Sequence, residues 1–480
     1  MQALLKQALD TATAAGASYA DVRWMDRQSQ SLVMRNGDVE TISETHSLGF
    51  GVRVLCNGAW GFASSADFSP AEIDRIAAQA VAIAKASATV RTRPVTLAPV
   101  APVQATYVTP FRIDPFAVPL AEKLALLEAA DKALRGEATV KVAHSLLICH
   151  KTHKIFASSD GAWIDQTIVE CGGGVSATAV GADEVQVRSY PSSHGGNLAT
   201  AGWEYVEALN LVAEAPRVAA EAAALLTAPT VPPGEQTVIL GSSQLALQIH
   251  ESIGHPTELD RVLGTELSFA GGSFLTPGAL GELRYGSDLV NVVADATCAL
   301  GLGTFGYDDE GVPAQRSHLI ENGLFTGFLT SRETAATLDQ PSNGTMRAQS
   351  WGDLPLIRMT NINLLPGAWT LDGLIADTAD GIFMDTNRSW SIDDRRLNFQ
   401  FACEAAWEIK DGVKGRLLKN PLYMGITPQF WGSCDAIADA AAWQIWGVPN
   451  CGKGEPMQSM HVGHGTSPAR FKRVNVGVAR

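Results

Sequence analysis

The sequence predicts an α+β fold, with two mixed N-terminal sections of helices and strands followed by a β-rich C-terminal domain. Ala-rich segments at helical spacing recur before residue 230, and Asn-Gly dipeptides separate strand-like runs near the N-terminus. After residue 234, short apolar runs alternate with Gly, Pro and Asn. Because 480 residues exceed what one hydrophobic core usually organises, we expect two or three domains.

The first section, residues 1–93, is predicted to combine strands with two helices. An amphipathic helix opens the chain. Strand-like runs then meet at Asn36-Gly37 and Asn57-Gly58, which favour tight hairpin turns. Ser69-Pro70 begins an Ala-rich helix, since proline is tolerated in a first helical turn.

The second section is predicted to span residues 120–230. Six prolines between residues 91 and 119 indicate a linker before it, because proline interrupts both helices and central strands. A helix over residues 120–134, three strand-like runs and a helix over residues 204–226 follow.

The third section, residues 234–480, is predicted to be the β-rich domain, built from several short strands. A helix is expected over residues 436–446, with Trp443 and Trp446 in the core.

Composition narrows the classes of function. The net charge of −14 and the lack of a dense Lys/Arg run argue against direct nucleic-acid binding. Lys6 and Asp10 interrupt the apolar pattern of the first helix, so it does not resemble an export signal, and no apolar window is long enough for a membrane span. Seven scattered cysteines without CxxC spacing fit reduced thiols, and we therefore expect a cytoplasmic protein.

The strongest functional signal is the segment QIHESIGHP, residues 248–256. His250 and His255 are candidate zinc ligands, because neutral imidazole binds zinc well. Glu251 adjoins the first histidine and is placed to take a proton from water, as in HExxH peptidases. Histidines five residues apart point about 140° apart on a regular helix. Since Gly254 and Pro256 flank His255, we expect the helix to end or bulge there.

A catalytic zinc site usually has three protein ligands and an open fourth position, so a third ligand must lie elsewhere. A glycine-rich stretch near the C-terminus offers Cys451, His461 and His464. A thiolate at Cys451 is the first choice on chemical grounds, but spacing alone does not separate the three.

Several motifs, in order along the chain, resemble the TldD/PmbA family on its TldD side. They are SLGFGVRV at 47–54, GAWGFAS at 58–64, HESIGH at 250–255, DDEG at 308–311 and CGKG at 451–454. The resemblance implies three sections, with a zinc ion bound by His250, His255 and Cys451 in the β-rich C-terminal metal-binding domain. It also implies that Glu251 is the catalytic residue and that this chain is the active subunit.

The resemblance further implies cleavage of small or unfolded peptides inside a chamber enclosed by a dimer. The partner would be a PmbA/TldE-like subunit or a second copy of this chain, and any link to DNA gyrase would be indirect. On this hypothesis Glu251 takes a proton from water and later passes it to the leaving amine. His461 and His464 are candidates to stabilise the oxyanion.

A different class of function is a non-catalytic binding or assembly subunit in which the metal is structural. Glu251 discriminates between the two, because a structural site needs no adjacent base. Direct action on gyrase or DNA is a third hypothesis, which the charge disfavours. The sequence GLGTFG at 301–306 matches a dinucleotide-binding pattern but leads into Asp308-Asp309-Glu310 rather than a helix. Those acids could line the cavity, but a solvated turn is the preferred expectation.

Overall fold

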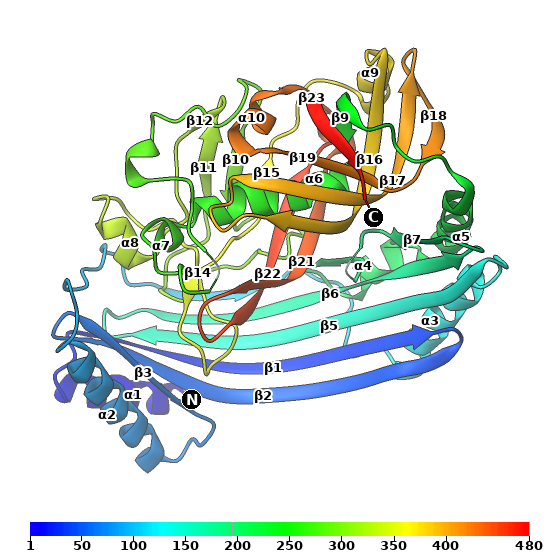
Figure 1. The fold of residues 1–480 in the computed structure, drawn as a ribbon. Coiled ribbons are helices and arrows are strands. Elements are labelled where there is room, and N and C mark those ends of the chain that lie inside the picture. Colours follow the sequence, from blue (N-terminus) through cyan, green and yellow to red (C-terminus); the bar gives the residue numbers. More distant parts are fainter. Residues whose placement is uncertain (194, 270, 480) are drawn as a thin grey trace.

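The computed structural model describes residues 1–193, 195–269 and 271–479. A sheet of long strands, blue to cyan-green in Figure 1, carries the N-terminal half of the chain. The C-terminal half, drawn from green to red, lies over one face of this sheet. The α+β fold class is confirmed.

One eight-stranded sheet runs through both N-terminal sections. Its order is β3-β2-β1-β5-β6-β4, and β7 and β8 also pair with β6. Because β1 pairs with both β2 and β5, the two N-terminal sections share one sheet. The section boundaries predicted at residues 93, 120, 230 and 234 stay a prediction. The strands are β1 (Tyr19–Arg35), β2 (Asp38–Cys56), β3 (Ala59–Ser65), β4 (Gln104–Val108), β5 (Val140–Ser158), β6 (Trp163–Val180), β7 (Val185–Tyr190) and β8 (Asn197–Ala199).

Both predicted Asn-Gly hairpins are confirmed. Asn36 and Gly37 have φ of 53° and 88°, and Asn57 and Gly58 have φ of 51° and 71°. Positive φ at both central residues is the geometry of a type I′ turn, whose twist matches that of the flanking strands.

Two groups of helices cover the ends of the long strands (Figure 1). α1 and α2 pack beside β1, β2 and β3, and α3 and α5 pack beside β5, β6 and β7. The predicted helix over residues 204–226 is two helices, because Asn210 adopts a left-handed conformation between them. The helices are α1 (Gln2–Ala14), α2 (Pro70–Ser87), α3 (Leu120–Leu134), α4 (Trp203–Ala208) and α5 (Leu211–Thr227). The predicted linker contains β4, which pairs in parallel with β6.

The C-terminal half is built around a closed barrel. The strands follow the order β16-β9-β23-β19-β17, and β17 pairs back to β16, while β18 and β20 extend the barrel sheet. The prediction of a β-rich third section is confirmed. The barrel strands are β9 (Gly234–Leu240), β16 (Asp380–Ile392), β17 (Asn398–Lys410), β18 (Val413–Leu418), β19 (Pro421–Ile426), β20 (Cys434–Ile437) and β23 (Ala469–Val478).

Smaller sheets and short helices surround the barrel. The strands are β10 (Val292–Asp295), β11 (Arg316–Glu321), β12 (Leu324–Phe325), β13 (Met346–Arg347), β14 (Leu356–Ile357), β15 (Ile362–Leu364), β21 (Gln444–Lys453) and β22 (Gln458–Thr466). The helices are α6 (Ser242–Ile249), α7 (Leu259–Val262), α8 (Arg332–Ala336), α9 (Leu371–Ala376) and α10 (Thr427–Gly432). Among the described residues, no helix is long and apolar enough to cross a membrane.

The helix predicted over residues 436–446 is wrong. This segment contains the end of β20, a single 3₁₀ turn at Ala440–Ala442 and the start of β21. β21 pairs with β22 from Gln444 onward, so the β-forming residues Ile445 and Trp446 lie in a hairpin. Strand pairing therefore overrides the helical preference of the short alanine run.

α6 carries the start of the functional motif and lies against β15, β16, β21 and β22. All but one of its eight residues are buried. Two of its glutamines bind one tyrosine: Tyr423 Oη donates to Gln248 Oε1 at 2.9 Å and accepts from Gln244 Nε2 at 2.9 Å. Buried polar groups that are paired in this way fix the helix in one position.

Candidate metal centre

The backbone changes helical type inside the HExxxH motif. After α6, His250–Gly254 is a π-helical turn, and His255–Thr257 is a 3₁₀ turn. The His255 amide donates to the His250 carbonyl, which closes the five-residue turn. A π turn places residues five apart over one another, so both imidazoles lie on one side of the chain. The predicted bulge is confirmed.

Gly254 permits the π turn because a side chain would not fit there. A Cβ atom at this position would lie 2.1 Å from the sulfur of Met359, which is fully buried. We therefore expect Gly254→Ala to lower the free energy of unfolding by about 1–3 kcal/mol, as overpacking does in other cores.

Urea denaturation of Gly254→Ala, Met359→Ala and the double variant measures this effect. Met359→Ala removes the opposing sulfur, so the double variant should lose less stability than the two single losses added together. If the stability loss of the double variant equals the sum of the two single losses to within about 0.5 kcal/mol, the steric explanation is contradicted.

Three potential ligands converge beyond this turn. One donor atom each from His250, His255 and Cys451 lies within 4.8 Å of the others, and all three residues are buried. His255 Nε2 is 3.7 Å from Cys451 Sγ. Zinc bonds of about 2.0 Å to nitrogen and 2.3 Å to sulfur separate tetrahedral ligand atoms by about 3–4 Å. The donor set and its spacing fit a zinc ion.

Cys451 reaches the cluster from the β21–β22 hairpin, about 200 residues after the histidines. It is paired with Met460, and the register of the hairpin shifts between Val448 and Cys451. The guanidinium of Arg358 donates to the Cys451 carbonyl and holds this part of β21. Of the three candidates for the third ligand, Cys451 is the one whose donor atom groups with those of His250 and His255.

A buried ion-pair network orients His255. Its Nδ1 lies 3.0 Å from Glu258 Oε2, so Nδ1 carries the hydrogen and Nε2 faces the cluster. Glu258 also accepts from Arg261 Nε at 3.1 Å and lies 3.4 Å from Lys453 Nζ. Since Lys453 follows Cys451 by two residues, the same network links two of the three candidate ligands.

A chain of hydrogen bonds sets the tautomer of His250. His464 Nδ1 lies 3.3 Å from the Ile362 carbonyl, which can only accept, so Nδ1 of His464 is the donor. The other nitrogen of a neutral His464 then accepts from His250 Nδ1 at 2.8 Å. The lone pair of His250 Nε2 is left for a metal ion.

The pKa shifts of the three donors are in the direction that favours metal binding. Burial lowers the pKa of His250 and of His255, which keeps both imidazoles neutral. Burial raises the pKa of the Cys451 thiol, but nearby Arg358 and His255 outweigh it and hold that pKa below its ordinary value. A thiolate and two neutral imidazoles are the forms that bind zinc.

Glu251 and the three candidate ligands line one cavity of about 210 Å³. Glu251 Oε2 accepts from Arg396 Nη1 at 3.0 Å, and Arg396 also lines the cavity, from the turn between β16 and β17. The remaining wall combines apolar and small polar side chains, including Ala246, Leu247, Trp390, Trp446, Val448, Pro449, Ser192, Ser193, Ser243, Asn387 and Asn450.

The other two histidines proposed from the sequence lie outside this cavity. His464 is fully buried behind His250. His461 pairs with Glu170 at 2.9 Å and lines a different cavity, on the sheet side of the hairpin. Arg396 was not found from the sequence, because it is 145 residues from Glu251 and no motif surrounds it.

The acidic DDEG segment is buried, so the expectation of a solvated turn is wrong. Asp309 Oδ1 pairs with Lys154 Nζ at 2.6 Å, and Glu310 Oε1 pairs with Arg53 Nη1 at 3.2 Å. Both partners lie on strands of the N-terminal sheet. These acids are buried because they attach the C-terminal half to that sheet.

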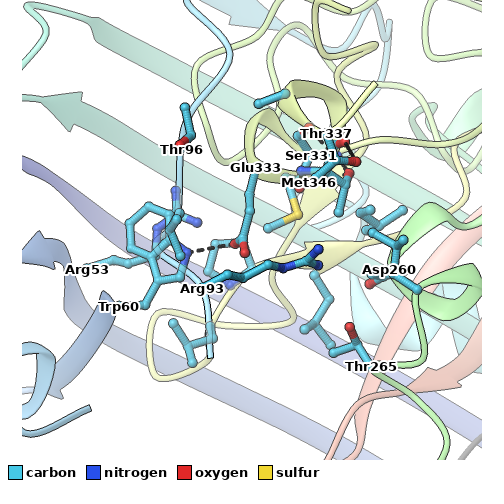
Figure 2. A pocket seen from close by; sticks show the side chains of 18 of the residues that line it. Arg53, Trp60, Arg93, Thr96, Asp260, Thr265, Ser331, Glu333, Thr337 and Met346 are labelled. Carbon is cyan, nitrogen blue, oxygen red and sulfur yellow. Dashed lines mark hydrogen bonds between the residues drawn. The ribbon is translucent and has the colours of Figure 1, made fainter. Parts of the chain in front are cut away.

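A larger cavity of about 400 Å³ contains none of the candidate ligands (Figure 2). On one side Trp60 Nε1 donates to Glu333 Oε2 at 2.8 Å, and Asp260 lies on the other. Asp260 pairs with Lys453 at 2.7 Å, and Lys453 contacts Glu258. Ion pairs therefore link Asp260, in the wall of this cavity, to Glu258, the carboxylate that orients His255.

Three family models match the chain in sequence. Residues 20–84 match "PmbA/TldA metallopeptidase domain 1", residues 113–228 match the central domain and residues 233–478 match the C-terminal domain. A metalloprotease of Methanocaldococcus jannaschii is 32% identical, over 84% of this chain and 85% of its own length. A metalloprotease of Methanothermobacter thermautotrophicus is 30% identical, over 96% and 95%. A zinc metalloprotease TldD homologue of Saccharolobus solfataricus is 28% identical, over 51% and 52%.

Solved structures share the fold. A Thermotoga maritima protein described as a candidate modulator of a DNA gyrase superposes with a TM-score of 0.76 at 16% identity, covering 99% of this chain and all of its own. TldE from Thermococcus kodakarensis gives a TM-score of 0.72 at 15% identity, with 99% and 100% covered. Family models that cover most of the chain and relatives that match over nearly their whole length lead to one conclusion: this chain belongs to the PmbA/TldD family of metallopeptidases.

Proposed function

We propose that this chain is a zinc peptidase that hydrolyses short or unfolded peptides at the site formed by His250, His255 and Cys451, with Glu251 as general base. The observation that carries the proposal is the convergence of two imidazoles and a cysteine sulfur, with Glu251 on the wall of the same cavity. Three protein ligands leave one coordination position for water or substrate, as in catalytic zinc sites. The relative in Saccharolobus solfataricus is named a zinc metalloprotease, which supports zinc as the metal.

Glu251 and Arg396 have different roles in the proposed peptide hydrolysis. Zinc, when bound, supplies a Lewis acid that polarises the peptide carbonyl and makes water more acidic. Glu251 takes the proton from water and passes it to the leaving amine. Arg396 positions the Glu251 carboxylate and places a positive charge in the cavity where the carbonyl oxygen becomes negative. Arg396 thus takes the role first considered for His461 and His464.

The substrate is proposed to bind as an extended strand. Among the described strands, β21 pairs only with β22, and Val448, Pro449 and Asn450 of β21 line the metal cavity. An extended peptide that pairs along this edge would be held through its backbone, with little side-chain selectivity. A complex of the inactive Glu251→Gln variant with a peptide tests this, and a peptide bound as a compact helix would contradict it.

Location and assembly stay predictions. We expect a cytoplasmic protein that pairs with a PmbA/TldE-like subunit or with a second copy of this chain, so that the pair encloses the site in a chamber. The family and the fold shared with TldE support this assembly. Sedimentation of the purified chain, alone and with such a subunit, distinguishes the two assemblies. No direct contact with nucleic acid is expected, given the net charge of −14.

Metal removal tests the proposed function. Treatment with a chelator should abolish cleavage of an unfolded peptide, and one equivalent of zinc per chain should restore it, since the donor set is complete without other residues. Zinc content by mass spectrometry and cleavage by chromatography are measured on the same samples. Full cleavage by metal-free protein would contradict the proposal, and tight zinc binding with no cleavage would favour the structural-metal alternative.

A further inference from the structure

A separate cavity of about 80 Å³ lies between the N-terminal sheet and the β21–β22 hairpin, which extends down to that sheet in Figure 1. We propose that this cavity binds a small anion with a carboxylate or phosphate group, held by the guanidinium groups of Arg27 and Arg347. The charged residues that line it are Arg27, Lys154, Glu170, Asp309, Arg347 and His461.

Arg347 is a buried cation that forms no direct ion pair with a described carboxylate. Its side chain lies over the ring of Phe305, 5.4 Å from the centroid, and the residue is only 9% exposed. Its guanidinium donates to the Met359 carbonyl, but Nε has no hydrogen-bond partner and no described carboxylate lies within ion-pair distance. Burial and nearby Arg358 lower the pKa of Arg347 to about 10. A buried charge without a partner is costly, and a bound anion would remove that cost.

Arg27 approaches the same cavity from β1, where it is paired with Thr152 of β5. Its Nε is buried and has no hydrogen-bond partner, and no described carboxylate forms an ion pair with it. Two guanidinium groups that line one cavity, each with a buried Nε that has no hydrogen-bond partner, supply the donors with which arginine binds carboxylate and phosphate oxygens.

The other charges around the cavity are already paired. Lys154 Nζ contacts Asp309 Oδ1 at 2.6 Å, and His461 Nδ1 contacts Glu170 Oε2 at 2.9 Å. The negative charge of Glu170 opposes anion binding, although one of its oxygens is already occupied by the contact with His461 Nδ1. Arg27 and Arg347 are therefore the cations of this lining that form no ion pair with a described carboxylate, and an excess of cations over carboxylates in the lining favours a negative ligand.

The cavity is distinct from the metal centre. It is lined by Ser459, Met460 and His461 of β22 and by none of the candidate ligands or Glu251. Because Met460 pairs with Cys451, an anion bound here would lie against the strand that supports the third candidate ligand. The inference does not depend on the peptidase proposal.

Calorimetric titration of the full chain with inorganic phosphate and, separately, with acetate tests the proposal. Saturable binding of at least one anion is expected, and Arg27→Gln should weaken it about tenfold or more, because one charge-assisted contact is lost. Tighter binding of phosphate would identify a phosphoryl ligand, and tighter binding of acetate a carboxylate. Arg27→Lys keeps the charge and should recover part of the affinity.

Arg35→Gln is the matched control, because Arg35 lies on the same strand, is paired with Glu40 and is outside the cavity. It should bind the anion as the native chain does. Arg347→Lys, which shortens the reach of the second cation, should also weaken binding, and melting curves verify that each variant is folded. Absence of saturable binding for both anions, or equal affinity in the native chain and Arg27→Gln, would overturn the proposal. Anion bound at the metal centre would be insensitive to Arg27.

Discussion

Glu251→Gln is expected to lower kcat/KM for peptide cleavage by about 100-fold to 10,000-fold while zinc content stays unchanged, as loss of a general base does in other enzymes. The amide keeps the size of the side chain and can still contact Arg396, but it cannot accept a proton from water. Glu251 contributes no atom to the candidate ligand cluster, so the metal should remain. Cleavage assays and metal analysis on the same preparations measure both quantities.

Glu404→Gln is the matched control for this variant. Glu404 is also a buried glutamate of the C-terminal half paired with an arginine, Arg188 at 3.2 Å, but it does not line the metal cavity. It should retain cleavage. Arg396→Gln removes the cation but keeps the base, so a partial loss of kcat/KM is expected. Native activity in Glu251→Gln would show that the base is another group, and loss of zinc would assign the carboxylate a structural role.

The local features of this site could be predicted from the sequence because they depend on neighbouring residues. Gly254 and Pro256 flank His255 and mark a helix that cannot continue regularly, and the structure has a π turn there. The Asn-Gly turns were equally predictable, because few other residue pairs accept positive φ at both positions. Such signals do not depend on the rest of the fold.

Features that depend on distant contacts could not be predicted in this way. Arg396 meets Glu251 only because the β16–β17 turn reaches the end of α6, and nothing near Arg396 in the sequence indicates this. His464 is a residue type that can bind zinc, but it lies behind His250 and forms a hydrogen bond with it. The acidic DDEG segment looked solvated because its cationic partners, Lys154 and Arg53, come from the other half of the chain.

The choice of Cys451 as third ligand, over His461 and His464, rests on one contact at 3.7 Å and has a direct consequence. Cys451→Ala leaves two histidines, so zinc affinity should fall by more than about 100-fold, the upper end of what losing a supporting residue costs. Mass spectrometry should then find well under one zinc per chain, and cleavage should be lost with it.

Cys403→Ala is the control for this change, because Cys403 is a fully buried thiol of the same half that lies outside the cluster. It should keep zinc and activity, so a loss confined to Cys451→Ala is attributable to the ligand and not to a cavity in the core. Since a metal that binds only the folded chain stabilises it, chelator should lower the melting temperature of Cys403→Ala but leave that of Cys451→Ala unchanged. If Cys451→Ala retains one zinc while His464→Ala loses it, the third ligand is His464, and Cys451 only packs against His255.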